Sequence, residues 1–219
     1  MAKKILMIVT NTKQMDEKHE TGLWLQEFVE PSMEFKQAGF EITAASIKGG
    51  KIPIDPNSYS NDLPDIWDGV MEPLRDTIPL EQVKPAEFDA VFLSGGHGTM
   101  FDFPENQELG KILEHFVEEK KTISAVCHGP AGFIGVKDKN GKSIVSGVKI
   151  TGFTNEEEVE AKVEKLLPFK LEDKLREEGA EFIVSGTSQD HVEVDGNFVT
   201  GQNPQSSLST AQAVIRQLQ

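Results

Sequence analysis

The stretch Thr122-Ile-Ser-Ala-Val-Cys-His-Gly-Pro-Ala-Gly132 decides how we interpret this chain. It opens with an apolar run typical of a buried strand, and small residues follow where a helix would begin. We therefore expect a sharp strand-to-helix turn, as in a nucleophile elbow, that lifts Cys127 above the carboxyl end of the strand. Amides at the start of that helix would favour the thiolate, which is the reactive form of cysteine.

A second interpretation of Cys127 is that it only packs, because free cysteine is among the most buried residue types. The strand, the turn and the adjacent His128 favour the reactive thiol. His128 can hold the proton that the thiol gives up if its ring turns toward the sulfur. Adjacency in the sequence does not establish that contact, so an ordinary polar role for His128 stays open.

Short apolar runs like the one before Cys127 recur along the chain, and amphipathic segments stand between most of them. We expect strands at Ile5–Val9, Glu41–Ser46, Ala90–Leu93, Thr122–Val126, Val148–Thr151 and Phe182–Val184. We expect helices at Gly22–Ala38, Glu105–Lys121 and Ser206–Leu218. The alternation predicts an α/β fold with a mainly parallel sheet covered by helices. Asp195-Gly196, between the runs His191–Val194 and Asn197–Thr200, predicts a small antiparallel hairpin at the sheet edge.

The 219 residues are enough for one large domain with a full core. We expect a single domain over residues 1–219. A loop-rich insertion is expected at about residues 49–85, where Pro, Asn, Asp, Gly and Ser accumulate between scattered apolar residues. A loop this long in a compact domain usually shapes a site or an interface.

The charge and the cysteine count exclude several classes of function. A formal net charge of -14 and a pI near 4.8 argue against binding to nucleic acid or to an anionic membrane. The apolar stretches are too short to cross a hydrocarbon core and the start has no signal-peptide pattern, so we expect a cytoplasmic protein. One cysteine excludes an internal disulfide and a cysteine-rich zinc site, and we expect no metal and no cofactor.

A glycine-rich loop, Ser94-Gly-Gly-His-Gly-Thr99, follows the expected strand Ala90–Leu93. Its glycines let the backbone approach a ligand closely and leave amides free to bind an anion or an oxyanion. We expect the loop beside the Cys127 turn, at the same edge of the sheet. Phosphate binding as in a dinucleotide fold is a weaker interpretation, because the spacing is not G-x-G-x-x-G.

Two acidic places are candidate parts of a site. Glu27 has the apolar neighbours of Thr21-Gly-Leu-Trp-Leu-Gln-Glu-Phe, and partial burial there would raise its pKa and let it exchange a proton with the thiol or a substrate. A glutamate on a helix is also often just solvated. The run Glu156-Glu-Glu158 by itself is explained by negative charge that stabilises a helix N-terminus, and the alternative is that one of the three carboxylates orients His128.

Together these residues resemble the ThiJ/PfpI superfamily over nearly the whole chain. The matching pieces are Thr21-Gly with Glu27, Ser94-Gly-Gly-His-Gly-Thr-Met-Phe-Asp102, Ala125-Val-Cys-His-Gly-Pro130, Thr151-Gly-Phe with Glu158, and Val199-Thr-Gly-Gln-Asn-Pro204. The chain is most similar to the branch that contains glutathione-independent glyoxalases (glyoxalase III) and related heat-shock chaperones. The resemblance implies a flavodoxin-like three-layer sandwich with helices on both faces of the sheet.

The resemblance also implies roles for single residues. Cys127 would be the nucleophile, His128 its partner, Glu158 the third member and Glu27 the carboxyl group near the sulfur. A shift of one residue would give the role of Glu158 to Glu157. Substrate and oxyanion binding would fall to the glycine loop at Gly95, Gly96 and His97, with the amides of Gly96 and His128 on the oxyanion and His97 at the entrance.

The implied activity is conversion of methylglyoxal, or a related 2-oxoaldehyde, to a 2-hydroxy acid through a hemithioacetal on Cys127. Glycated proteins would be tethered substrates of the same chemistry, and a homodimer is expected. The alternatives are a holding chaperone or redox sensor that binds unfolded proteins through Ile52–Pro79, with Ile66, Trp67 and Leu74, and a cysteine peptidase of the PfpI type. We expect no glutaminase activity: that class needs a late histidine as partner of the thiol, and the final forty residues have only His191, in Gln-Asp-His-Val-Glu.

Overall fold

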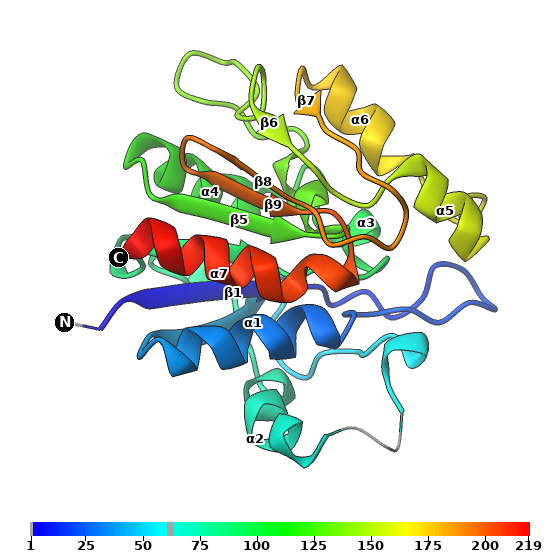
Figure 1. The fold of residues 1–219 in the computed structure, drawn as a ribbon, viewed down its shortest axis with the longest axis horizontal. Coiled ribbons are helices and arrows are strands. Elements are labelled where there is room, and N and C mark those ends of the chain that lie inside the picture. Colours follow the sequence, from blue (N-terminus) through cyan, green and yellow to red (C-terminus); the bar gives the residue numbers. More distant parts are fainter. Residues whose placement is uncertain (1, 61–63) are drawn as a thin grey trace.

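The computed structural model describes residues 2–60 and 64–219, and a seven-stranded sheet lies at its centre (Figure 1). The strand order is β3-β2-β1-β4-β5-β9-β8, and neighbours are parallel except for the edge strand β8, which runs antiparallel to β9. The bounds are β1 (Lys4–Val9), β2 (Glu41–Ser46), β3 (Ile78–Pro79), β4 (Ala90–Leu93), β5 (Thr122–Val126), β8 (Val192–Asp195) and β9 (Phe198–Gly201). This arrangement confirms the predicted parallel sheet with an antiparallel edge.

The inner strand β1 shows why helices cover both faces of the sheet. Its apolar residues from Ile5 to Val9 are all fully buried, and alternate side chains point to opposite faces. Leu6 and Ile8 pack in the core under α4 (Gln107–Glu118), whereas Met7 and its alternate neighbours pack under α1 (Gln26–Gln37) and α7 (Ser207–Leu218). Figure 1 shows α1 and α7 side by side on one face of the sheet.

The helix predicted at Gly22–Ala38 begins later, at Gln26, because the residues before it pair with the insertion. The amide of Leu23 donates to the carbonyl of Pro53 at 2.9 Å, and the Asp55 amide donates back to the Leu23 carbonyl at 2.9 Å. Extended backbone in that pairing replaces the first helical turns. The C-terminal end of α1 agrees with the predicted helix end, because Gly39 follows the helix with a φ of +79°.

The segment predicted as a loop-rich insertion holds short helices and an edge strand. It contains α2 (Asp68–Met71), β3, and the 3₁₀ helices η1 (Pro56–Ser58), η2 (Asp65–Trp67), η3 (Glu72–Arg75), η4 (Leu80–Gln82) and η5 (Pro85–Glu87). Of the three side chains expected on an exposed binding surface, Ile66 is exposed and Trp67 is partly buried. The expectation is wrong for Leu74, which is buried because it packs against the core on the α1 side.

The strands predicted at Val148–Thr151 and Phe182–Val184 do not join the main sheet. They are shorter, as β6 (Lys149–Ile150) and β7 (Glu181–Phe182), and they pair with each other in a separate two-stranded parallel sheet. The helices α5 (Asn155–Ala161) and α6 (Leu171–Glu177) connect these two strands. In Figure 1 this unit lies beside the β8–β9 hairpin, and it carries the start of α5 toward the carboxyl edge of the sheet.

The remaining short helices are α3 (Thr99–Asp102), η6 (Gly129–Phe133) and η7 (Pro204–Ser206). Each begins at or shortly after the carboxyl end of a strand, so their first residues surround one edge of the sheet. Within the described ranges, no helix is both long enough and apolar enough to cross a membrane.

Candidate active site

Cys127 lies directly after β5, in a backbone conformation that residues with a side chain rarely adopt. Its φ is +59°, in the left-handed region, which costs about 1–3 kcal/mol. Two hydrogen bonds hold it there: the Cys127 amide donates to the Gly201 carbonyl at 3.0 Å, and the Phe153 amide donates to the Cys127 carbonyl at 2.8 Å. The turn is as sharp as predicted. The helix after it is the short 3₁₀ helix η6, which ends before Gly135, where φ is +81°.

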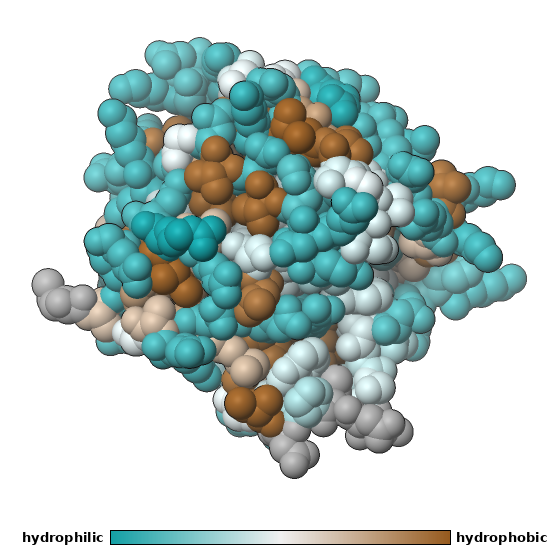
Figure 2. Space-filling view, in the orientation of Figure 1, coloured by the Kyte–Doolittle hydropathy of each residue, from teal (hydrophilic) through white to brown (hydrophobic). Residues whose placement is uncertain are grey.

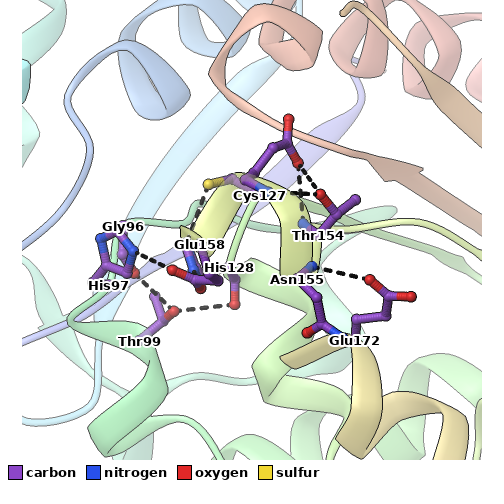
Figure 3. A network of polar contacts seen from close by, with 10 residues as sticks. Gly96, His97, Thr99, Cys127, His128, Thr154, Asn155, Glu158 and Glu172 are labelled. Atoms are coloured by element: carbon purple, nitrogen blue, oxygen red, sulfur yellow. Dashed lines mark hydrogen bonds and ion pairs between the residues drawn. The ribbon is translucent and has the colours of Figure 1, made fainter. Parts of the chain in front are cut away.

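The side chains of Cys127, His128 and Glu158 form a chain of contacts (Figure 3). The Cys127 Sγ lies 3.2 Å from the His128 Nδ1, and the His128 Nε2 lies 2.6 Å from a carboxylate oxygen of Glu158. All three side chains are at most 3 % exposed. The structure therefore brings together the three residues that the sequence and the resemblance proposed, including the contact that adjacency alone left open.

His97 adds a second histidine to this group. Its Nε2 lies 3.1 Å from the other carboxylate oxygen of Glu158, and its ring centroid lies 4.2 Å from that of His128. One carboxylate thus holds two imidazoles (Figure 3). The sequence placed His97 at the entrance but missed this contact, because 61 residues separate it from Glu158 and no local pattern links them.

The start of α5 explains why Glu158 rather than Glu157 faces His128. Thr154 and Glu157 form a capping box: the Thr154 amide and hydroxyl both donate to one Glu157 oxygen at 3.0 Å. The other Glu157 oxygen accepts from the Asn203 side chain at 2.8 Å. The Asn155 amide donates to Glu172 on α6 at 3.0 Å (Figure 3). These bonds fix the helix start, and with it the direction of the next side chain.

Glu27 is a fully buried carboxyl group on the other side of the sulfur. One of its oxygens accepts from the Gly95 amide at 2.8 Å, and the other has no hydrogen-bond partner among the described residues. Burial raises the pKa of Glu27 to about 8, although the interactions with Cys127 and with the Gly95 amide act in the opposite direction. Glu27 is therefore protonated at neutral pH, with the raised pKa that the sequence predicted.

The pKa of the Cys127 thiol is shifted in the direction opposite to the one expected from the helix amides. Burial, and after it the neighbouring Glu27, raise the pKa of the Cys127 thiol well above its usual value. Burial also lowers the pKa of His128, and His97 contributes in the same direction, so His128 is neutral at pH 7. The geometry thus pairs a thiol with a neutral imidazole, and the thiol loses its proton only when a reaction draws it away.

The pKa of Glu158 is shifted in the opposite direction to that of Glu27. Its burial favours the neutral acid, but the interactions with His128, and then with His97, prevail and lower the pKa of Glu158 to about 2. An ionised Glu158 accepts the Nε2 proton of His128. That hydrogen bond leaves the Nδ1 of His128 unprotonated and facing the sulfur.

The glycine loop fits between α1 and the elbow only because it has no side chains at two positions. A Cβ on Gly95 would lie 2.4 Å from Glu27 and 2.7 Å from the His128 amide. Gly96 has a φ of +101°, and a Cβ there would lie 2.3 Å from the Gly22 carbonyl. The loop therefore packs directly against the backbone of the elbow, where the sequence placed a candidate oxyanion site.

A cavity of about 300 Å³ opens above the sulfur, at the lower end of the range for small-molecule sites. It is lined by Trp24, Gly96, His97, Cys127, His128, Phe153, Glu157, Glu160, Ala161, Ser188, Pro204 and Gln205. Ligand atoms of His97, His128 and Glu158 lie within 4.8 Å of one another, close enough to hold a metal ion. The hydrogen bonds between these residues already account for that proximity, so the geometry alone assigns no metal centre.

The fold and the site define an α/β protein with a cysteine at a strand-end elbow and a histidine–glutamate pair behind it. The family model described as the DJ-1/PfpI family matches residues 4–217. The chain belongs to the DJ-1/PfpI family.

Relatives named as glyoxalases match almost the whole chain. The glutathione-independent glyoxalase HSP31 of Saccharomyces cerevisiae is 33% identical over 95% of each chain. The crystal structure of glyoxalase III from Candida albicans has a TM-score of 0.88 and 31% identity, covering 98% of this chain and 96% of that one. The Rapid Encystment Protein of 24 kDa from Francisella tularensis has a TM-score of 0.92 and 35% identity over 99% of each chain. Each of these proteins is similar to this chain in fold and in sequence.

Proposed function

We propose that this protein is a glutathione-independent glyoxalase that converts methylglyoxal or a related 2-oxoaldehyde to a 2-hydroxy acid. The contact that carries the proposal is the 3.2 Å approach of the Cys127 Sγ to the His128 Nδ1, beside a cavity of about 300 Å³. The similar yeast proteins, which have about the same length and are named as glyoxalases, support the proposal.

The first step is addition of Cys127 to the aldehyde. The Sγ attacks the aldehyde carbon, C1, while the His128 Nδ1 takes the thiol proton. The aldehyde oxygen gains a proton, and the product is a hemithioacetal. Glu158 supports the step because its carboxylate stabilises the imidazolium that forms on His128. Amides of the glycine loop stabilise the charge that develops on the oxygen.

The second step moves a hydrogen from C1 to C2. Once neutral again, His128 removes the proton from C1, and the electron pair passes through an enediol to the C2 oxygen. Glu27, protonated at neutral pH, would act as the acid when C2 takes up a proton. The C2 oxygen takes the proton that His128 holds, and the C1 hydroxyl gives its proton back to Glu27. C1 is thereby oxidised to a thioester, and C2 is reduced to an alcohol. No outside oxidant or reductant takes part.

In the last step, water adds to the thioester carbon and the C–S bond breaks. The sulfur recovers a proton and the thiol is restored. The sum is methylglyoxal plus water giving lactate, with Cys127, His128 and Glu27 returned to their starting states. Because the sulfur comes from the protein, the chemistry needs no glutathione.

The test is methylglyoxal turnover in the absence of glutathione, with lactate measured as the product. We expect the wild type to form lactate and Cys127→Ala to form none above the uncatalysed rate. Cys127→Ser is the matched variant, because it replaces the thiol with a hydroxyl of similar size that is a weaker nucleophile. A wild-type rate no greater than that of Cys127→Ala would sink the proposal.

The other predicted activities are separable from this one. A holding chaperone needs an apolar surface, and Figure 2 shows apolar residues on one face as small patches separated by hydrophilic ones. Ile66 is 64 % exposed and is the side chain of the predicted surface best placed to contribute. Suppression of aggregation that survives Cys127→Ala and falls with Ile66→Ser would support the chaperone. Casein hydrolysis that disappears with Cys127→Ala would support the peptidase.

The remaining expectations about partners and location are also part of this proposal. We expect a homodimer in the cytoplasm, acting on small aldehydes and on glycated proteins. Light scattering coupled to gel filtration measures the mass in solution, and a mass near the 24.2 kDa of one chain would contradict the dimer. Release of lactate from a methylglyoxal-treated peptide tests the tethered substrate, with Cys127→Ala as the control.

A further inference from the structure

The lining of the cavity above Cys127 carries negative charge without basic side chains to balance it. Among the described residues that line it, two are glutamates, Glu157 and Glu160, and none is lysine or arginine. The two histidines of the lining, His97 and His128, contact the buried carboxylate of Glu158. A negatively charged molecule that enters this cavity therefore meets no fixed cation.

The two lining glutamates differ in how many hydrogen bonds their carboxylates accept. Glu157 is 3 % exposed and accepts hydrogen bonds at both oxygens, from backbone amides and from amide side chains. Glu160, one turn later on α5, is exposed and accepts one bond among the described residues, from the Thr187 hydroxyl at 3.1 Å. That bond fixes the carboxylate at the rim but leaves most of its charge facing the cavity and the solvent.

The proposed reaction changes the charge of the bound molecule. Methylglyoxal is neutral, whereas the 2-hydroxy acid formed from it is an anion at neutral pH. A carboxylate roughly 6 Å away in a wet cavity weakens binding of an anion by roughly three- to tenfold and leaves a neutral molecule almost unaffected. A negative rim therefore discriminates between substrate and product, as well as between neutral and anionic aldehydes.

We propose that Glu160 is a specificity-determining residue that selects neutral and cationic 2-oxoaldehydes, rejects anionic ones and promotes release of the hydroxy-acid product. The inference rests on the proposed glyoxalase function and deepens it by naming the substrate class. It also accounts for a tethered substrate, because an aldehyde adduct on a lysine or arginine side chain brings neutral or positive charge to the rim.

The experiment compares two 2-oxoaldehydes that differ in charge, methylglyoxal and 4,5-dioxopentanoate. The measured quantity is the ratio of kcat/KM for the anionic compound to kcat/KM for the neutral one. We expect Glu160→Gln to raise this ratio by roughly three- to tenfold, and Glu160→Lys to raise it further. The inhibition constant of lactate should fall by a similar factor in both variants.

The matched control is Glu156→Gln. Glu156 lies on the same helix, is exposed and is not among the residues that line the cavity. Its replacement changes the net charge of the protein by the same amount, so an effect of overall charge would appear equally in both variants. The wild-type ratio should also rise with added salt, because screening weakens the repulsion.

The outcomes separate the inference from the function on which it rests. A ratio that rises with Glu160→Gln but not with Glu156→Gln supports Glu160 as the selecting residue. With methylglyoxal turnover intact, equal ratios in wild type and Glu160→Gln, or equal rises in both variants, overturn the inference alone. A wild type that does not turn over methylglyoxal overturns the proposed function and the inference together. Melting curves of each variant verify that it is folded.

Discussion

Glu27 and Glu158 are two carboxyl groups with almost the same burial and opposite charge states. Both lie in the first turn of a helix, α1 for Glu27 and α5 for Glu158, and both are at most 1 % exposed. Burial raises the pKa of Glu27 to about 8, whereas interactions with two histidines overcome burial and lower the pKa of Glu158 to about 2. Both carboxyl groups are neighbours of the Cys127–His128 pair: Glu27 interacts with the Cys127 sulfur, and Glu158 contacts the His128 ring.

The difference between them comes from hydrogen-bond donors. Glu27 receives one backbone amide and has one oxygen without a partner among the described residues, so the neutral acid is the stable form. Glu158 has an imidazole nitrogen at each oxygen, so the carboxylate is stable. Burial alone therefore does not decide whether a carboxyl group is ionised. One site can hold a protonated and an ionised carboxyl group when only the ionised one has a hydrogen-bond donor at each oxygen.

Replacing the ionised member should have the largest effect. Glu158→Gln removes the negative charge and replaces one of the two acceptor oxygens with an NH2 group that donates, so the His128 ring can adopt the wrong tautomer toward Cys127. We expect kcat for methylglyoxal to fall by about 10⁴-fold, as is typical when the carboxylate behind a catalytic histidine becomes an amide. Steady-state kinetics measures it, and Glu156→Gln on the same helix is the control. A loss below about tenfold would show that His128 does not depend on Glu158.

Replacing the protonated member should cost less. Glu27→Gln keeps the acceptor for the Gly95 amide and a donor toward the sulfur, but it has no proton to exchange. We expect kcat/KM to fall by about 10²–10³-fold, the range for one acid–base group. Lactate formation measures the loss. If Glu27→Gln were as active as the wild type, Glu27 would be a spacer and not an acid.

The two carboxyl groups should change stability in opposite directions. A Glu27 whose pKa is about 8 folded and 4.5 unfolded destabilises the fold as pH rises from 4.5 to 8. Glu158 has a pKa of about 2 in the folded protein and 4.5 in the unfolded chain, so it stabilises the fold above pH 4.5. This contribution is lost as the pH falls toward 2. At pH 7, Glu27→Gln should raise the free energy of unfolding and Glu158→Gln should lower it, each by about 3 kcal/mol. Urea unfolding of both variants measures this, and shifts of equal sign would contradict it.

The pH dependence of the rate should report Glu27. Because the acid form is lost as pH rises through about 8, kcat/KM of the wild type should fall above that pH by up to about tenfold per unit. The residual activity of Glu27→Gln should not show this fall, since the amide does not titrate. A basic limb that persists unchanged in Glu27→Gln would assign it to another group.

The smallest expected effect concerns the helix that carries Glu158. Thr154→Ala removes the hydroxyl half of the capping box and should lower the free energy of unfolding by about 1 kcal/mol. Activity should fall only slightly, because the Thr154 amide still donates to Glu157. Thermal unfolding measures the change, and Thr154→Ser, which keeps the hydroxyl, is the control. A large loss of activity with Thr154→Ala would mean that the cap positions Glu158 directly.

Much of the fold was predictable because buried parallel strands have a simple sequence pattern. Ile5–Val9 and Thr122–Val126 are apolar throughout, and the structure has strands there. The start of α1 was not predictable, since it depends on hydrogen bonds from Leu23 to a segment about thirty residues later. The strands β6 and β7 have two residues each, too few to show a hydrophobic periodicity. The sequence therefore contains no sign that they lie outside the main sheet.

The residues of the site and the raised pKa of Glu27 were predictable, but the raised pKa of the Cys127 thiol and the contact of His97 were not. The glycine loop and the elbow marked one edge of the sheet, and the resemblance proposed Glu27 and Glu158. The contact of His97 with Glu158 arises only when the glycine loop and helix α5 fold together. The raised pKa of the Cys127 thiol follows from how completely the chain encloses it, which is a property of packing and not of the helix start that the sequence suggested.

The sole thiol of the chain is also its most useful chemical handle. Cys127 is 3 % exposed beside the cavity, and no second cysteine competes for a label. Intact-mass spectrometry after alkylation therefore counts occupied sites directly, one adduct for each polypeptide. The labelling rates of reagents of increasing diameter, from iodoacetamide to a bulky maleimide, would measure the width of the cavity entrance. The same series would detect any opening of this entrance in solution.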